Sequence, residues 1–147
     1  MTRAYDGIKI LDFTQVLSGP ISTFQLGLLG AQVIKVEPPD KGDMCRPLLD
    51  PTQFGKGFLS PFFIGANLNK RSIVVDLKHP DAKALLEPLV RDADVIVQNF
   101  RPGVIDRLGF GYDAVKALRS DIVYCAISGY GQTGPDAKNA AFDGAIQ

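Results

Sequence analysis

The sequence predicts an α/β fold in which helices cover a parallel β-sheet. Five short runs rich in Ile and Val recur along the chain, and helical patterns lie between most of them. Most of the runs are continuously apolar rather than alternating, which is typical of parallel strands buried on both faces. Strands that alternate with helices pair in parallel through right-handed crossovers. The expected strands are residues 8–12, 33–36, 72–76, 95–98 and 122–127.

Three helices are expected between these strands. The first, residues 22–29, follows Gly19-Pro20 and stops at Gly30. The second, residues 80–92, opens at a proline and carries an apolar stripe, but Pro88 inside it predicts a kink or a local break. The third, residues 113–119, begins with an acidic residue and ends with a basic one, which suits the helix dipole.

Two segments do not fit this alternation. Residues 38–67 are rich in Gly, Pro and Phe and show no period, so they form either a functional or covering loop or a poorly ordered excursion. Four aromatic side chains argue against full disorder, because they need burial: Phe54, Phe58, Phe62 and Phe63. Residues 140–147 begin a helical pattern that does not develop, so we expect a truncated chain or a fragment of a longer one.

Composition excludes several classes of protein. Sixteen basic residues balance sixteen acidic ones in 147, which predicts no nucleic-acid or membrane partner. No membrane-spanning run or signal-peptide pattern is visible. Cys45 and Cys125 lie far apart, and we expect Cys125, inside an apolar run, to be a buried thiol in a reducing, cytoplasmic setting. With the single His79 they form no metal-binding pattern.

In parallel sheets, ligands bind where the strands' carboxyl ends meet. Lys70 and Arg71 precede the third strand, Lys78 follows it, and Arg101 and Arg107 flank the turn after the fourth. Such cations can bind the phosphates of a coenzyme. The alternative is ordinary solvated surface charge.

Four further features at this edge each allow two interpretations. Residues 129–134 match G-x-G-x-x-G, but Pro135 follows at once, so a glycine-rich turn is favoured over a dinucleotide site. Phe100 either packs on a nucleotide base or caps the core. Ser18 either helps present backbone N–H groups to an anion or caps a helix. Asp143 is either a site group or a helix cap, and no Ser-His-Asp or Cys-His set can be drawn.

Taken together, the segments resemble the family III CoA-transferases, which include formyl-CoA and carnitine CoA-transferases and have the α-methylacyl-CoA racemases as relatives. The resemblance rests on the order and spacing of seven segments: ILDFTQVLSGP (10–20), LGAQVIKVEPP (29–39), GDM (42–44), NKRSIVVDLK (69–78), ADVIVQNFRPGVIDRLG (93–109), SGYGQTGP (128–135) and AFDGAIQ (141–147). It implies a Rossmann-like α/β fold, with residues 1–147 forming the N-terminal part of a larger CoA-binding domain whose small domain and returning segment are absent.

The resemblance also implies where coenzyme A lies. Leu17 and Ser18 are expected near its thiol end. Its adenosine and phosphate part is expected against Val75, Asp76, Leu77, Lys78, Asn99, Phe100, Arg101 and Arg107. The pantetheine arm is expected near Asn139, Ala140, Ala141, Phe142 and Asp143. Some relatives have an arginine where Pro38 stands and a glutamine where Leu17 stands, which puts formyl or oxalate specificity in question.

Members of the family use an aspartate as nucleophile, which attacks an acyl-CoA thioester to give a mixed anhydride and then an aspartyl-CoA thioester. We expect this residue beyond Gln147, with Asp143 lining the site, so the chain alone is expected to be inactive. The substrates implied are an acyl-CoA and a carboxylic acid, with no metal.

Two alternatives to a transferase remain. The racemases carry a catalytic histidine where Phe142 stands, which disfavours a racemase. The other alternative is an inactive CoA-binding module. Family members form interlocked homodimers, so the isolated chain is expected to expose apolar surface and to dissolve poorly or associate.

Overall fold

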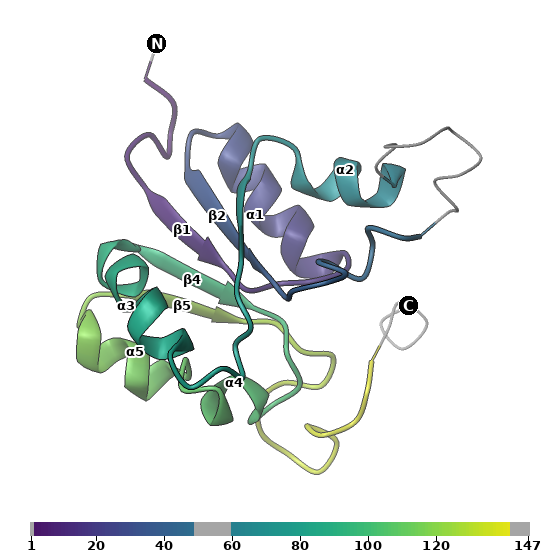
Figure 1. Ribbon diagram of the computed structural model, residues 1–147, viewed down its shortest axis with the longest axis vertical. Helices are drawn as coiled ribbons and strands as arrows, with labels where there is room; N and C mark the ends of the chain where they lie inside the picture. The colour runs from purple at the N-terminus through teal and green to yellow at the C-terminus, as the bar shows by residue number, and fades with distance from the viewer. Residues whose placement is uncertain (1, 49–59, 142–147) are drawn as a thin grey trace.

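The computed structural model describes residues 2–48 and 60–141, and in them five parallel strands form one sheet with five helices around it (Figure 1). The strands are β1 (Lys9–Asp12), β2 (Gln32–Glu37), β3 (Arg71–Val74), β4 (Val95–Gln98) and β5 (Val123–Ala126). The helices are α1 (Ser18–Leu28), α2 (Pro61–Asn67), α3 (Ala82–Asp92), α4 (Val104–Arg107) and α5 (Tyr112–Leu118). The predicted α/β class is confirmed.

The strand order is β3-β2-β1-β4-β5, with every neighbouring pair parallel. The chain builds outward from β1 through β2 to β3 and then returns to place β4 on the other side of β1. In the register, Ile10 of β1 lies between Val33 of β2 and Val95 of β4. The connections that leave β1 and β4 therefore run in opposite directions, which marks the switch point where such sheets bind ligands.

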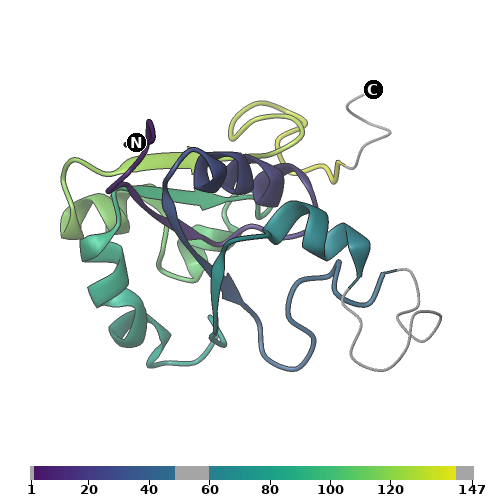
Figure 2. The same cartoon turned by 90° about the horizontal axis from the view of Figure 1, so that it is seen from above.

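Helix α1 covers one face of the sheet, and α3 and α5 cover the other (Figures 1 and 2). Ile10, Val33 and Val97 are buried in the cluster that Leu26 of α1 joins. Leu11 and Ile96, one position along their strands, are buried in a larger cluster with residues of α3 and α5. Successive strand side chains point to opposite faces, so the central strands need apolar residues at consecutive positions.

All five predicted strands are confirmed, with ends shifted by no more than two residues. Helix α1 begins four residues earlier than expected, with Pro20 in its first turn, where the missing N–H costs nothing. Of the kink or local break predicted at Pro88, the break is wrong, because α3 continues through the exposed proline while Leu86 and Val90 are buried against the sheet.

The sequence patterns missed α2 and α4, which are seven and four residues long and too short to show a helical period. Helix α2 lies within the segment 38–67, which is therefore not wholly irregular. Of the four phenylalanines in it, Phe63 is buried and Phe62 is exposed, whereas Phe54 and Phe58 lie outside the described residues.

Burial on both faces does not extend to the two outer strands. Val74 of β3 and Val123 of β5 are 66% and 60% exposed, because no described helix covers those faces. Cys125 shares the exposed face of β5, so the expected buried thiol is wrong. His79 is exposed. Within the described ranges, no helix has the length and apolar character needed to cross a membrane.

The packing of α3 predicts opposite results for two adjacent leucines. Leu86 is fully buried and Leu85 is 63% exposed. We expect Leu86→Ala to lower the free energy of unfolding by about 3 kcal/mol, because it removes buried methyl groups and creates a cavity. The matched variant Leu85→Ala should change it by less than about 0.5 kcal/mol. Urea unfolding followed by circular dichroism measures both, and similar losses would contradict this placement of α3.

Candidate functional site

The carboxyl ends of the five parallel strands meet at one edge of the sheet, and the predicted site residues lie in the segments that follow those ends. The central segment is the turn after β1, residues 13–17, which we call the β1 turn. It leads directly into α1, and the segment after β4 lies beside it.

Side chains from two other segments, those after β4 and β2, hold the backbone of the β1 turn. The amide of Asn99, after β4, accepts from the N–H of Gln15 at 2.9 Å and donates to its carbonyl at 2.8 Å. Asp43 Oδ1 accepts from the N–H of Val16 at 3.2 Å. Val16 has a φ of 71°, a conformation that a β-branched residue adopts only when its surroundings impose it.

Four buried charged side chains lie next to the β1 turn. Lys35 Nζ pairs with Asp43 Oδ2 at 2.8 Å, and Lys70 Nζ pairs with Asp12 Oδ2 at 3.0 Å, with none of the four side chains more than 3% exposed. Lys35 also donates to the carbonyl of Thr14 at 2.6 Å. Buried charges are tolerated when they are paired and hydrogen-bonded, and here two cations meet two anions.

The second of these pairs ties α1 and α2 to β1. Lys70 Nζ donates to the carbonyl of Pro20 in α1 and to Asn67 Oδ1 at the end of α2, at 2.8 and 2.9 Å. Thr23 of α1 donates to the same carboxylate oxygen of Asp12 at 2.6 Å. Burial lowers the pKa of Lys70 by more than the negative charge of Asp12 raises it.

Glu37, at the end of β2, is a further buried carboxylate. It accepts from Arg46 Nε at 2.6 Å and Nη2 at 2.7 Å, from the hydroxyl of Ser72 and from the N–H of Asp43. Burial would raise the pKa of Glu37, but these hydrogen bonds and the charge of Arg46 outweigh it and lower the pKa to about 2. Arg46 also stacks over the ring of Phe63 at 3.8 Å, so it fastens α2 to this cluster.

The predicted thiol-end residues lie where the β1 turn becomes a helix. Leu17 is the half-buried N-cap of α1, and the exposed Ser18 is its first residue. No side-chain hydrogen bond caps this helix within the described part of the chain. The capping role considered for Ser18 is therefore not what the structure shows.

One apolar cluster brings together the segments after β3 and β4. Val75 is buried in it beside Phe13 and Ile105, and Leu77 and Phe100 pack against it half-buried. Of the two interpretations of Phe100, the structure shows the core contact. Asp76 is exposed, and its Oδ1 accepts from the N–H of Lys78 at 2.9 Å, which shapes the turn after β3.

Three cations of this edge are exposed and, among the residues described, make no ion pair: Lys78, Arg101 and Arg107. Lys70, considered with them from the sequence, is instead buried and paired with Asp12. Arg71 lies at the start of β3 and donates to Gln32 at 3.3 Å, so it is not part of this edge.

The segment after β5 is exposed from Gly129 to Asp136 and contains bends and turns but no helix up to residue 141. The glycine-rich stretch is therefore a turn, as the favoured interpretation has it, and no helix opens on its glycines. Asn139 is exposed and donates to Asp136 Oδ1 at 2.9 Å. Ala140 is exposed and Ala141 half-buried, whereas Phe142 and Asp143 lie outside the described residues.

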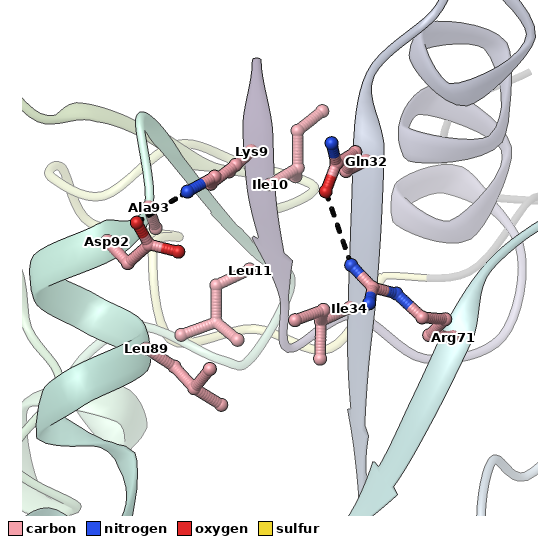
Figure 3. A pocket seen from close by; sticks show the side chains of 9 residues that line it. All are labelled: Lys9, Ile10, Leu11, Gln32, Ile34, Arg71, Leu89, Asp92 and Ala93. Atoms are coloured by element: carbon pink, nitrogen blue, oxygen red, sulfur yellow. Dashed lines mark hydrogen bonds and ion pairs between the residues drawn. The ribbon is translucent and has the colours of Figure 1, made fainter. Parts of the chain in front are cut away.

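Two hollows flank these features. One lies at the ends of β2 and β3 and is lined by Glu37, Pro38, Lys41 and Arg46 among others, so it belongs to the same edge. The other lies on the α3 face, with Leu11, Ile34 and Leu89 in it and the pairs Lys9–Asp92 and Arg71–Gln32 at its rim (Figure 3). Of the cations considered from the sequence, Arg71 lines this second hollow, and none of the residues expected to contact coenzyme A does.

Comparison with known sequences decides the family, because the profile of CoA-transferase family III matches residues 5–147. The chain belongs to CoA-transferase family III. It is 42% identical over 141 residues to succinyl-CoA:glutarate CoA-transferase of Homo sapiens, covering 96% of this chain and 32% of that protein. It is 43% identical over 145 residues to acetyl-CoA:oxalate CoA-transferase of Acetobacter aceti, covering 97% of this chain and 36% of that one.

Solved structures share this fold. A CAIB/BAIF family protein from Brucella suis matches with a TM-score of 0.89 at 36% identity, covering 100% of this chain and 39% of that one. The protein Rv3272 of Mycobacterium tuberculosis matches with a TM-score of 0.86 at 35% identity, covering 96% and 38%. The chain thus spans about a third of the length of these curated relatives.

Sequence reasoning missed the buried charges that shape this family III edge. Asp12, Lys35 and Glu37 were treated as ends or interruptions of apolar runs. A signal was present, because a lysine inside Val-Ile-Lys-Val-Glu is buried wherever the strand is covered on both faces, and a buried lysine needs a carboxylate. The identity of its partner, Asp43, could not be read from the sequence.

The depressed pKa of Glu37 predicts a pH effect on stability. Its pKa is about 2 in the folded chain, against an ordinary 4.5, so its carboxylate stabilises the fold above pH 4.5. This contribution, on the order of 2 kcal/mol, is lost as the pH falls from 4.5 through 2. Glu37→Gln should remove it, lowering the unfolding free energy at pH 7 and flattening its pH dependence in that window. Glu87→Gln, in an exposed pair with Arg91, is the matched control and should do neither.

Proposed function

We propose that this chain supplies the coenzyme A-binding part of an enzyme that transfers CoA between an acyl-CoA and a carboxylic acid. The observation that carries the proposal is the family III match over residues 5–147, which includes every segment at the carboxyl edge of the sheet. The names of the two curated relatives above support the reaction class, since both are CoA-transferases of acyl-CoA and dicarboxylic acids. The two relatives differ in their named substrates, so the proposal does not specify which acyl-CoA donates CoA or which acid accepts it.

Charge supports the placement of the coenzyme under this proposal. Coenzyme A carries three phosphate groups, and Lys78, Arg101 and Arg107 are cations at the edge without a carboxylate partner in the described part of the chain. Guanidinium groups bind phosphate oxygens in a bidentate manner, and lysine adds a point charge. The adenosine part would lie near Val75, Asp76, Leu77, Asn99 and Phe100, with the pantetheine arm directed toward Leu17, Ser18 and residues 139–143.

Lys41 is a candidate that sequence reasoning did not consider. Pro38 stands where some relatives have an arginine, and Lys41 lines the same hollow as Pro38. It is exposed and makes no ion pair with a described residue. We therefore assign Lys41 to the phosphate contact that an arginine at position 38 would otherwise provide.

The proposed chemistry is covalent catalysis by an aspartate outside residues 1–147. Its carboxylate attacks the acyl-CoA carbonyl and releases the CoA thiolate, leaving a mixed anhydride. The thiolate then attacks the aspartyl carbonyl, which releases the donor acid and leaves an aspartyl-CoA thioester that passes CoA to the acceptor. The residues described here would bind and orient the coenzyme, with no metal in the reaction. Under the same proposal, the enzyme forms an interlocked homodimer in the cytoplasm.

Titration separates this function from an unrelated role for the edge. We expect coenzyme A to bind the chain in isothermal titration calorimetry. Arg101→Ala should weaken binding about tenfold, because a charged hydrogen bond to phosphate contributes about 1.5 to 3 kcal/mol. The loss should shrink as salt is raised, since these contacts are solvent-exposed.

Lys9→Ala is the control for this titration, because Lys9 is an exposed cation at the amino end of β1. Its affinity should equal that of the unsubstituted chain. Equal losses in both variants would point to general charge attraction, and no binding by the unsubstituted chain would overturn the proposed function.

A further inference from the structure

We propose that the buried Lys35–Asp43 pair is a positioning device for the β1 turn and sets the affinity of the chain for the pantetheine part of coenzyme A. Both are positioning residues in this scheme, because their side chains are buried and act through the backbone of residues 14–16. The inference rests on the proposed function, which places the thiol end of the coenzyme beside Leu17 and Ser18.

The pair forms hydrogen bonds with two successive peptide units of the β1 turn. Lys35 Nζ donates to the carbonyl of Thr14 at 2.6 Å, and Asp43 Oδ1 accepts from the N–H of Val16 at 3.2 Å. The other oxygen of Asp43 faces Lys35 at 2.8 Å. One ion pair thus fixes the groups on either side of Gln15, whose own N–H and carbonyl are held by Asn99.

The turn needs such fixation because its conformation is unfavourable. Val16 has a φ of 71°, which costs a β-branched residue free energy that its surroundings must supply. Gly19 restricts the turn from the other side, since a Cβ there would overlap Cγ2 of Thr14. The first turn of α1 and the β1 turn are therefore in direct contact.

The pair also joins the turn to a second segment of the same edge. Asp43 Oδ1 accepts from the N–H of Cys45 at 2.9 Å, and the Cys45 thiol donates to the carbonyl of Val16 at 3.4 Å. The N–H of Asp43 donates to Glu37, which is bonded to Arg46. The hollow lined by Pro38 and Lys41 and the start of α1 are thus coupled through Asp43.

Two ligands distinguish positioning from a general structural role. Coenzyme A carries the pantetheine arm, whereas adenosine 3′,5′-bisphosphate carries only the nucleotide end. In calorimetric titrations, Lys35→Met should weaken coenzyme A binding about tenfold or more, because the turn loses the hydrogen bond from Lys35 to Thr14 and Asp43, which holds Val16, loses its counter-ion. The affinity for the bisphosphate should change less than about twofold, because the contacts proposed for it after β3 and β4 do not involve this pair, and Lys41, after β2, makes no ion pair with Asp43 among the described residues.

A second variant and a control complete the test. Asp43→Asn keeps an oxygen that can accept from Val16 and removes the charge that holds Lys35, so it should show the same selectivity with a smaller loss. Leu86→Ala destabilises the opposite face of the sheet and should leave the ratio of the two affinities unchanged. In the unsubstituted chain, coenzyme A but not the bisphosphate should slow amide hydrogen exchange at Leu17 and Ser18.

The outcomes separate the two proposals. The positioning role is overturned if Lys35→Met lowers the affinity for both ligands equally or for neither of them. It is also overturned if both ligands slow hydrogen exchange at Leu17 and Ser18 alike. In each case the proposed site stands. If the unsubstituted chain binds neither ligand, the proposed function fails and this inference fails with it.

Discussion

The arrangement of this edge depends on one constraint: charges buried beneath α1 must be paired. Asp12, Lys35, Asp43 and Lys70 come from four separate segments, yet each is at most 3% exposed and faces a partner of opposite charge. A single unpartnered member would leave a charge in the interior at a cost of several kcal/mol. Because of that penalty, β1, β2, α1, α2 and the segment after β2 must keep one relative arrangement. That arrangement also fixes the conformation of the β1 turn.

The two faces of the sheet differ in polarity near the carboxyl ends of the central strands. On the α3 side, the cluster around Leu86 and Ile96 is apolar from the strands to the helices. On the α1 side, β1 changes from Ile10 to Asp12 and β2 from Val33 to Lys35 and Glu37 as the strands approach their carboxyl ends. Alternation along a strand keeps these residues on one face, so polar groups gather at the end where a ligand is expected.

Burial, rather than residue type, assigns the cations of this chain their roles. Lys70 and Lys78 flank the same strand, β3. The first is buried against Asp12 and neutralises a structural carboxylate, whereas the second is exposed at the carboxyl edge with no ion pair in the described residues. Arg46 also has a structural role, because it pairs with Glu37 and stacks over the ring of Phe63. The cations available to bind phosphate are those whose charge is not paired with a buried carboxylate.

The sequence by itself determined the five strands, the parallel α/β class and the family, because apolar runs and ordered motifs are local patterns that survive without coordinates. It also favoured a turn for the glycine-rich stretch, because Pro135 follows it at once. Only the tertiary structure decided that Lys35 meets Asp43, that α3 continues through Pro88, and that Cys125 is exposed. Each of these depends on which distant segment covers a residue, and that is decided by the packing of helices on the sheet.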